Sequence, residues 1–216
     1  MNFWESRWMN GQTGWHSSDI NAHLKTYHQI LFQQDTPKIF VPLCGQSLDM
    51  AWLNEQGASI VGVDLVRQPL EQYFDVQNMT PKSQTVQDLE SLTSGSLTLF
   101  HANVFDVNND IIGNVDAIYD RAALVALSPE FRESYVAHCL SLLKPGGSIL
   151  LITYDSPVAD DHGPPFPVRK GTVERLFAGV QECIQIDEVH TTKADSERLQ
   201  KRNLDWSRSD IWKITK

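Results

Sequence analysis

Short apolar runs alternate with helical patterns through most of this chain, and that alternation restricts the folds open to it. Apolar runs of strand length occur at 38–43, 58–65, 97–107, 115–124 and 148–154. Helical spacing of apolar residues occurs between several of these runs, at 47–56, 68–77 and 129–143. Strands that alternate with helices form a parallel sheet covered on both faces. We therefore predict an α/β fold with a doubly wound, mostly parallel sheet.

The carboxyl ends of parallel strands form the rim at which such folds bind ligands. In this chain the predicted rim comprises Leu43–Gly45, Asp64, Asn103–Val104 and Tyr119–Arg121. Residues 179–192 and 209–216 indicate two further strands, which we expect to form an antiparallel hairpin at the sheet edge. The aromatic N-terminal segment and the proline-rich segment 156–168 fit no regular element, and we expect them to cover the rim.

Size and composition favour one domain that binds small molecules. With 216 residues, 41% of them hydrophobic, the chain can form a single core. We predict one domain, 1–216, with an N-terminal cover at 1–37 and a core at 38–216. A formal net charge of -9 argues against an extended contact with nucleic acid phosphates. No apolar run is long enough to span a membrane and no leader is evident, so we predict a cytoplasmic protein, and a monomer because no apolar surface stripe is evident.

The cysteines and histidines form no metal or redox motif. Cys44, Cys139 and Cys183 are widely spaced and odd in number, which excludes a CxxC knuckle and a disulfide framework. His23 and His28 miss the i to i+4 spacing that stacks two ligands on one helix face. We therefore predict reduced thiols and no metal, and we interpret Cys44 as inert packing rather than a nucleophile.

One glycine and one acid define the candidate ligand site. The stretch "VPLCGQSLDM" turns from strand to helix at Gly45 and lacks the G-x-G-x-x-G pattern that lets backbone amides approach a pyrophosphate. Asp64 lies 19 residues further on, near the spacing at which an acid on the second strand binds ribose hydroxyls. Taken alone, Gly45 is equally a tight turn and Asp64 equally a helix cap. Together they favour a nucleoside without phosphate, such as S-adenosylmethionine.

Several motifs resemble one family. The stretches "FWESRWMNGQTGWH", "VPLCGQSLDM", "GVDL", "YDRAALVAL", "LKPGG" and "GPPF" occur in the order and spacing of the thiopurine S-methyltransferase family, a branch of the class I S-adenosylmethionine-dependent methyltransferases. The resemblance covers nearly the whole chain. It implies a seven-stranded Rossmann-like sheet with an aromatic N-terminal cover, S-adenosylmethionine as methyl donor, and methyl transfer to the sulfur of small aromatic or heterocyclic thiols. Bacterial members are linked to tellurite and selenite, so selenium and tellurium species join the expected acceptors.

The resemblance also implies which residues bind the cofactor: Trp8, Trp15, Leu43, Asp64, Asn103, Val104 and Arg121. In this set Asp64 holds the ribose, whereas Asn103 and Val104 flank the adenine. Three positions depart from the family pattern. Asp64 stands where the family usually has Glu, Gln46 where Lys is common, and Trp15 where Phe is common.

The acceptor site needs no dedicated catalytic acid or base. An aromatic thiol reacts as the thiolate, so catalysis depends on alignment and on desolvation of the nucleophile. Arg121 steers the thiolate and lowers its pKa, or pairs with Asp120 or Asp116. Phe166 in "GPPF" lines the acceptor pocket or anchors its own loop. Arg198 binds an anionic group of the substrate or lies on a solvated charged face.

Two other functions stay open at the level of sequence. The spacing of the acid also fits an NAD-dependent dehydrogenase, although the missing glycines count against it. Because no residue pattern proves turnover, the chain also fits a non-catalytic protein that binds S-adenosylmethionine or sequesters chalcogen oxyanions.

Overall fold

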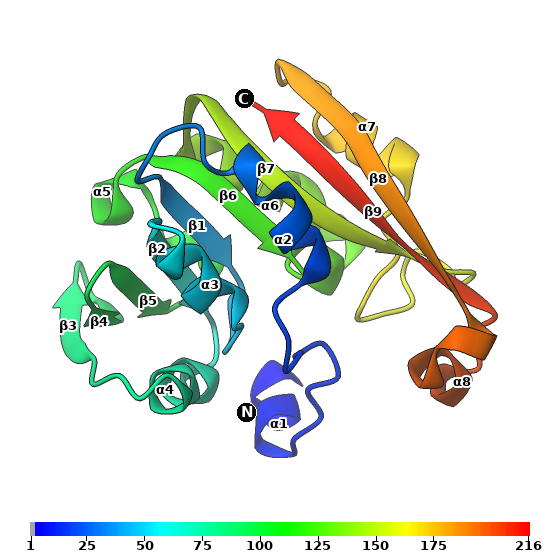
Figure 1. Ribbon diagram of the computed structural model, residues 1–216, viewed down its shortest axis with the longest axis horizontal. Coiled ribbons are helices and arrows are strands. Elements are labelled where there is room, and N and C mark those ends of the chain that lie inside the picture. Colours follow the sequence, from blue (N-terminus) through cyan, green and yellow to red (C-terminus); the bar gives the residue numbers. More distant parts are fainter. Residues whose placement is uncertain (1–2) are drawn as a thin grey trace. The chain divides into compact units, whose positions relative to one another are not determined.

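The computed structural model describes residues 3–216 (Figure 1). The chain divides into two compact units, Met1–Tyr119 and Asp120–Lys216. The prediction of one domain at 1–216, with an N-terminal cover at 1–37 and a core at 38–216, stays a prediction. Among the described residues, no helix is long and apolar enough to cross a bilayer. The same residues contain no group of three His, Cys, Asp or Glu side chains arranged to hold a metal ion.

The first unit contains a mixed sheet in the order β3-β4-β5-β2-β1-β6. Its strands are β1 (Lys38–Pro42), β2 (Ser59–Asp64), β3 (Lys82–Val86), β4 (Leu89–Ser94), β5 (Leu97–His101) and β6 (Val115–Arg121), whose last two residues belong to the second unit. β5, β2, β1 and β6 pair in parallel, whereas β3, β4 and β5 pair antiparallel. Strands in a parallel sheet are buried on both faces, which explains why continuous apolar runs predicted them.

Helices connect the strands of the first unit. α3 (Asp49–Glu55) and α4 (Arg67–Val76) follow β1 and β2, and the short α5 (Asn109–Ile112) precedes β6. The N-terminal segment contains two short helices, α1 (Phe3–Met9) and α2 (Ala22–Tyr27), although its sequence predicted no regular element. Short 3-10 turns occupy His28–Ile30 and Val104–Asp106.

The second unit contains three long antiparallel strands in the order β7-β9-β8 (Figure 1). They are β7 (Leu143–Asp155), β8 (Glu182–Thr192) and β9 (Trp206–Thr215), and its helices are α6 (Arg132–Leu142), α7 (Lys170–Leu176) and α8 (Glu197–Arg202). Three 3-10 turns lie at Leu124–Ala126, Pro129–Phe131 and Lys193–Asp195. The pairing of β8 with β9 confirms the predicted antiparallel hairpin.

The described chain has nine strands, so the predicted number of seven was wrong by one hairpin. The seven predicted strands are present, and the additional ones are β3 and β4. The turn between them is formed by Gln87 and Asp88, which both have positive φ angles, 46 and 69. Such turns normally carry Asn-Gly or Asp-Gly. Since β3 is largely exposed and its turn contains no glycine, the sequence offered no usable signal.

Candidate active site

The turn after β1 adopts a conformation that favours glycine. Leu43 and Gly45 both have positive φ angles, 48 and 50. A Cβ atom on Gly45 would lie 3.0 Å from Cζ2 of Trp8, closer than ordinary van der Waals contact. Leu43 adopts a strained left-handed conformation, and outliers of this kind cluster at ligand sites. The turn is therefore a tight structure packed against the N-terminal segment.

Asp64 ends β2 and binds this turn directly. Its Oδ2 accepts a hydrogen bond from the backbone N–H of Gly45 at 2.9 Å, and its Oδ1 accepts one from the N–H of Val66 at 2.9 Å. Burial raises the pKa of Asp64 to about 6, although the two backbone N–H groups oppose that rise. The side chain is only half-buried, and a carboxylate has about four lone-pair sites. Asp64 therefore stabilises the turn and retains acceptor capacity.

Aromatic residues of the N-terminal segment pack on one another beside the turn. Trp15 contacts Trp4 and Trp8 edge to face, with ring centroids 5.3 and 5.7 Å apart respectively. Trp8 is buried, 6% exposed, and its ring covers Gly45. The structure thus brings together three of the predicted site positions, Trp8, Trp15 and Asp64, around the glycine that the motif contains.

Two further predicted residues follow the neighbouring strand. β5 pairs with β2 so that His101 lies opposite Asp64. Asn103 comes two residues later, is exposed, and accepts a hydrogen bond from the N–H of Phe105. Val104 is buried. Asn103 and Val104 therefore extend the same rim of the first unit beyond β2.

The remaining predicted residues belong to the second unit. Arg121 ends β6 and is half-buried. Beside it, Asp120 is buried and accepts hydrogen bonds from the Tyr135 hydroxyl at 2.7 Å and the Leu124 N–H at 3.1 Å. Burial raises the pKa of Asp120 to about 6, and these donors oppose that rise. The backbone around Arg121 is thus anchored by a buried acid.

Arg198 lies on α8 within the electrostatic field of two other guanidinium groups. Partial desolvation lowers the pKa of Arg198, and the charges of Arg202 and Arg121 lower it further, whereas Tyr154 raises it. A bound anion would relieve the mutual repulsion of such a cluster. The charges of Arg121 and Arg198, both predicted from sequence as site residues, therefore act on each other within the second unit.

The proline-rich segment 156–168 forms an anchored loop. The N–H of Phe166 donates to the Val125 carbonyl at 2.7 Å, and a Cβ on Gly163 would lie 2.5 Å from Cγ of Phe166. The Phe166 ring thus packs on its own loop, which is one of the two roles that the sequence left open. The other role, in the acceptor pocket, stays a prediction. Both peptide bonds before Pro164 and Pro165 are cis.

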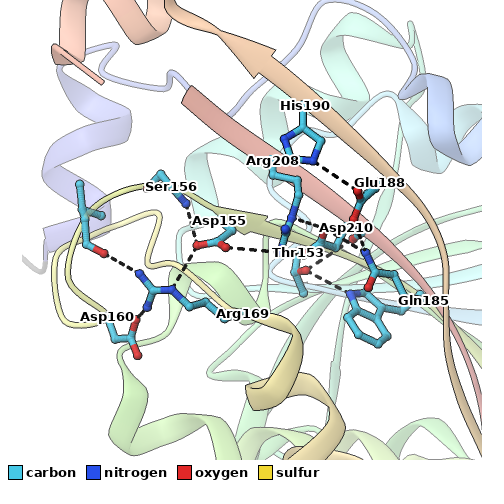
Figure 2. A network of polar contacts seen from close by, with 12 residues as sticks. Thr153, Asp155, Ser156, Asp160, Arg169, Gln185, Glu188, His190, Arg208 and Asp210 are labelled. Carbon is cyan, nitrogen blue, oxygen red and sulfur yellow. Dashed lines mark hydrogen bonds and ion pairs between the residues drawn. The ribbon is translucent and has the colours of Figure 1, made fainter. Parts of the chain in front are cut away.

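Arg169, which no motif contained, clamps the same loop at its end (Figure 2). Its guanidinium donates to the Val158 carbonyl at 2.8 Å, pairs with Asp160, and lies 3.5 Å from Oδ1 of Asp155. Asp155 is buried and lies 3.4 Å from Arg208. A single arginine in a polar segment gives no periodic signal, so the sequence does not predict this role for Arg169.

The first unit suits a nucleoside ligand without phosphate. In a phosphate-binding loop the backbone N–H groups point toward the ligand. Here the N–H of Gly45 is bonded to Asp64 instead, and the carboxylate beside it presents acceptors suited to ribose hydroxyls. The bonded Gly45 N–H and the accepting Asp64 carboxylate fit the ribose of S-adenosylmethionine and do not fit a dinucleotide pyrophosphate.

Solved structures of known proteins share this fold. The 1,6-didemethyltoxoflavin-N1-methyltransferase of Burkholderia thailandensis, solved with 1,6-didemethyltoxoflavin and S-adenosylhomocysteine bound, superposes with a TM-score of 0.64 at 18% identity, over 98% of this chain and 84% of that one. The cyclopropane synthase MmaA2 of Mycobacterium tuberculosis superposes with a TM-score of 0.65 at 13% identity, over 93% and 87%. The fold is that of the class I S-adenosylmethionine-dependent methyltransferases.

Sequence comparison then identifies the branch. The model of the thiopurine S-methyltransferase family matches residues 1–216. The thiopurine S-methyltransferase of Nitrosospira multiformis is 37% identical over 202 residues, 94% of this chain and 91% of that protein. The probable thiopurine S-methyltransferase of Yarrowia lipolytica is 37% identical over 195 residues, 87% and 88% of the two chains. The chain belongs to the thiopurine S-methyltransferase family and is an S-adenosylmethionine-dependent methyltransferase.

Proposed function

We propose that this methyltransferase transfers the methyl group to the sulfur of small aromatic or heterocyclic thiols, and that selenium and tellurium species are further acceptors. Membership in the family supports the thiol acceptor. The observation that carries the cofactor side of the proposal is the bond from the Gly45 N–H to Asp64, because it replaces the phosphate cradle with an acid. We also propose that the protein is a monomer and that it is located in the cytoplasm.

The first unit supplies the proposed cofactor contacts. Asp64 accepts hydrogen bonds from the ribose hydroxyls with its remaining lone pairs, and Leu43 contributes backbone groups at the strained turn. The Trp8 and Trp15 rings exclude water and offer π-faces to a cationic sulfonium. Asn103 and Val104 complete the contacts proposed for the first unit. Arg121 belongs to the second unit, and we propose it as a cofactor-binding residue from the family resemblance alone.

Asp64 is one methylene shorter than the Glu usual in this family. In this chain the shorter carboxylate bonds the Gly45 N–H at 2.9 Å. We therefore propose that the ribose hydroxyls donate to the Asp64 lone pairs that the Gly45 N–H leaves unoccupied, either directly or through one water.

Binding of the methyl acceptor depends on arginine side chains, and transfer depends on the alignment of the acceptor with the methyl donor. When bound, S-adenosylmethionine supplies an electrophilic methyl group for in-line displacement. Arg121 and Arg198 attract an anionic acceptor and favour the thiolate form of a thiol, because a nearby cation lowers its pKa. Phe166 forms an apolar wall presented by an anchored loop. We assign no catalytic acid or base, since a thiolate needs none.

Binding and turnover test the proposal separately. Calorimetry with S-adenosylhomocysteine tests the cofactor site, and complete absence of binding would refute it. Transfer of a radiolabelled methyl group to a panel of thiols, selenols and tellurium compounds tests the acceptor class. Product with aromatic thiols supports the proposal, whereas cofactor binding without product from any acceptor would favour a binding or sequestering role.

The acceptor arginines have a matched control. Arg121→Ala and Arg198→Ala should raise the KM for a carboxylate-bearing thiol, because they remove charge from the region that attracts it. Arg175→Ala removes an equivalent charge from α7, where Arg175 pairs with exposed Glu133. Equal KM values for all three variants would contradict the assignment of Arg121 and Arg198.

A further inference from the structure

A buried carboxylate lies at the start of the helix that follows the glycine turn. Asp49 opens α3 and is 1% exposed. Its Oδ1 accepts a hydrogen bond from the N–H of Asn21 at 2.8 Å, and its Oδ2 accepts one from the hydroxyl of Tyr119 at 2.9 Å. A buried polar group costs free energy unless it is hydrogen-bonded, so these bonds are needed for the fold around Asp49.

The partners of Asp49 come from distant parts of the first unit. Asn21 belongs to the N-terminal segment and caps α2, because its Oδ1 accepts from the N–H groups of His23 and Leu24 at 2.9 and 3.2 Å. Tyr119 lies near the end of β6. One carboxylate thus joins the N-terminal segment, the helix after the turn and a parallel strand. It also joins two of the motifs in the sequence, "SLDM" and "YDRAAL".

The N-terminal segment has a second attachment near the same turn. Trp8 packs over Gly45, where a Cβ atom would lie 3.0 Å from its ring. Residues 10–20, which we name the cover loop, follow α1 and run between the attachments at Trp8 and Asn21. Trp15 lies in the cover loop and contacts Trp8 edge to face. The position of Trp15 therefore depends on two attachments, one apolar and one through Asp49.

We propose that Asp49 is a positioning residue for cofactor binding, which acts by docking the cover loop beside the turn that Asp64 holds. This inference rests on the proposed function, because it assumes that Trp8, Trp15 and Asp64 bind the cofactor. Asp49 itself is too buried to contact a ligand at the rim. Its contribution is to limit the freedom of the cover loop before the ligand arrives, so that less entropy is lost on binding.

Three substitutions at the Asp49 cluster separate positioning from simple stability. Asp49→Ala removes both bonds and should weaken S-adenosylhomocysteine binding about tenfold or more, mainly through faster dissociation. Asp49→Asn keeps one acceptor for the Asn21 N–H and can donate to the Tyr119 oxygen, so its affinity should stay within about threefold of the unmodified chain. Tyr119→Phe, which removes one hydroxyl and is expected to fold, should fall between them.

The matched control is a second buried side-chain hydrogen bond, away from the proposed binding residues. Thr153 in the second unit accepts a hydrogen bond from Nε1 of Trp212 at 3.2 Å, so Thr153→Val removes one buried hydroxyl there with little change in shape. It should lower thermal stability about as much as Tyr119→Phe and leave S-adenosylhomocysteine affinity unchanged. Amide hydrogen exchange of the ligand-free protein should be faster in the cover loop for Tyr119→Phe only. Equal affinity losses for the two variants would overturn the inference.

A double-mutant cycle tests the route of the effect. If Asp49 acts through the cover loop, Asp49→Ala should weaken binding much less in a Trp8→Ala background, because that attachment is already lost. Fully additive losses overturn the inference. If the unmodified chain binds S-adenosylhomocysteine and folded Asp49→Ala binds it equally well, the inference fails and the proposed function survives. If the unmodified chain does not bind, both fail.

Discussion

Two loops of this methyltransferase, one in each unit, are held by different means. In the turn at residues 43–49 of the first unit, the buried Gly45 N–H donates to half-buried Asp64, and Asp49 accepts two hydrogen bonds at 1% exposure. In the second unit, the first half of the loop 156–168 is held by the side chain of Arg169, which is 42% exposed, through Asp155 and Asp160 (Figure 2), whereas its last residues are fixed by buried Arg132, which donates to the Pro167 carbonyl at 3.1 Å.

The difference matches the tasks that we propose for the two loops. Buried hydrogen bonds give one well-defined geometry that salt hardly affects, which suits a cofactor that is the same in every turnover. Exposed ion pairs contribute about 0–1 kcal/mol and adapt easily. A loop held in this way suits an acceptor site that has to admit ligands of different shape. The comparison therefore predicts that changes in the turn affect the cofactor and changes in the loop affect the acceptor.

The largest effect is expected from a methyl group on the turn. Gly45→Ala places a side chain at a φ angle of 50, which costs about 1–2 kcal/mol, and also displaces the Trp8 ring. We expect S-adenosylhomocysteine affinity to fall by about 100-fold or more, measured by calorimetry. Gly95→Ala is the control, because its φ angle is 59 but no atom lies within 4 Å. Equal affinity losses for both variants would show that the effect is not specific to the turn at Gly45 and would contradict its proposed role.

A methyl group on the loop should affect the other substrate. A Cβ on Gly163 would lie 2.5 Å from Cγ and 2.7 Å from the N atom of Phe166, so the ring or the loop has to move. Gly163→Ala should raise the acceptor KM by about tenfold, within the range of overpacking costs, with cofactor affinity unchanged. Gly171→Ala, which meets no atom within 4 Å, should change neither. A loss of cofactor affinity in Gly163→Ala would break the proposed division of tasks.

Protonation of Asp64 should weaken cofactor binding without affecting the loop 156–168. Because burial raises the pKa of Asp64 to about 6, the carboxylate is mostly ionised at pH 7 and mostly protonated at pH 5.5. Protonation removes the charge that accepts ribose hydrogen bonds, so S-adenosylhomocysteine affinity should fall about fourfold over this interval.

Two isosteric variants assign the titration to its carboxylate. Asp64→Asn should bind weakly and with little pH dependence, since it has no proton to gain. Asp120→Asn provides the control, because burial raises the pKa of Asp120 to about 6 as well. It should retain the pH dependence of the unmodified chain. If Asp120→Asn also abolishes the dependence, Asp64 is not the group that titrates.

The two loops also differ in how far sequence could predict them. Gly45 and Asp64 lie at the ends of apolar strands, so periodicity and spacing placed both correctly. The bond between them, and the Trp8 ring over Gly45, depend on how a distant segment folds back, which no local pattern encodes. "GPPF" led to Phe166 as a candidate site residue, a role that stays a prediction, whereas no pattern pointed to Arg169, which holds the first half of the same loop. An exposed ion pair has no periodicity and costs little to change, so it leaves little trace in a single sequence.

The smallest effect is expected from a substitution of Arg169. The salt dependence of that effect shows how Arg169 holds the loop. Arg169→Gln removes the ion pairs with Asp155 and Asp160 and should raise the acceptor KM by about two- to fivefold at low ionic strength. Added salt screens the same pairs in the unmodified chain, so the difference between the two proteins should shrink toward 1 M salt. Arg175→Gln, which breaks the exposed pair with Glu133, should have no such effect. A salt-independent KM difference would mean that Arg169 holds the loop through its bond to the Val158 carbonyl, as buried groups hold the turn.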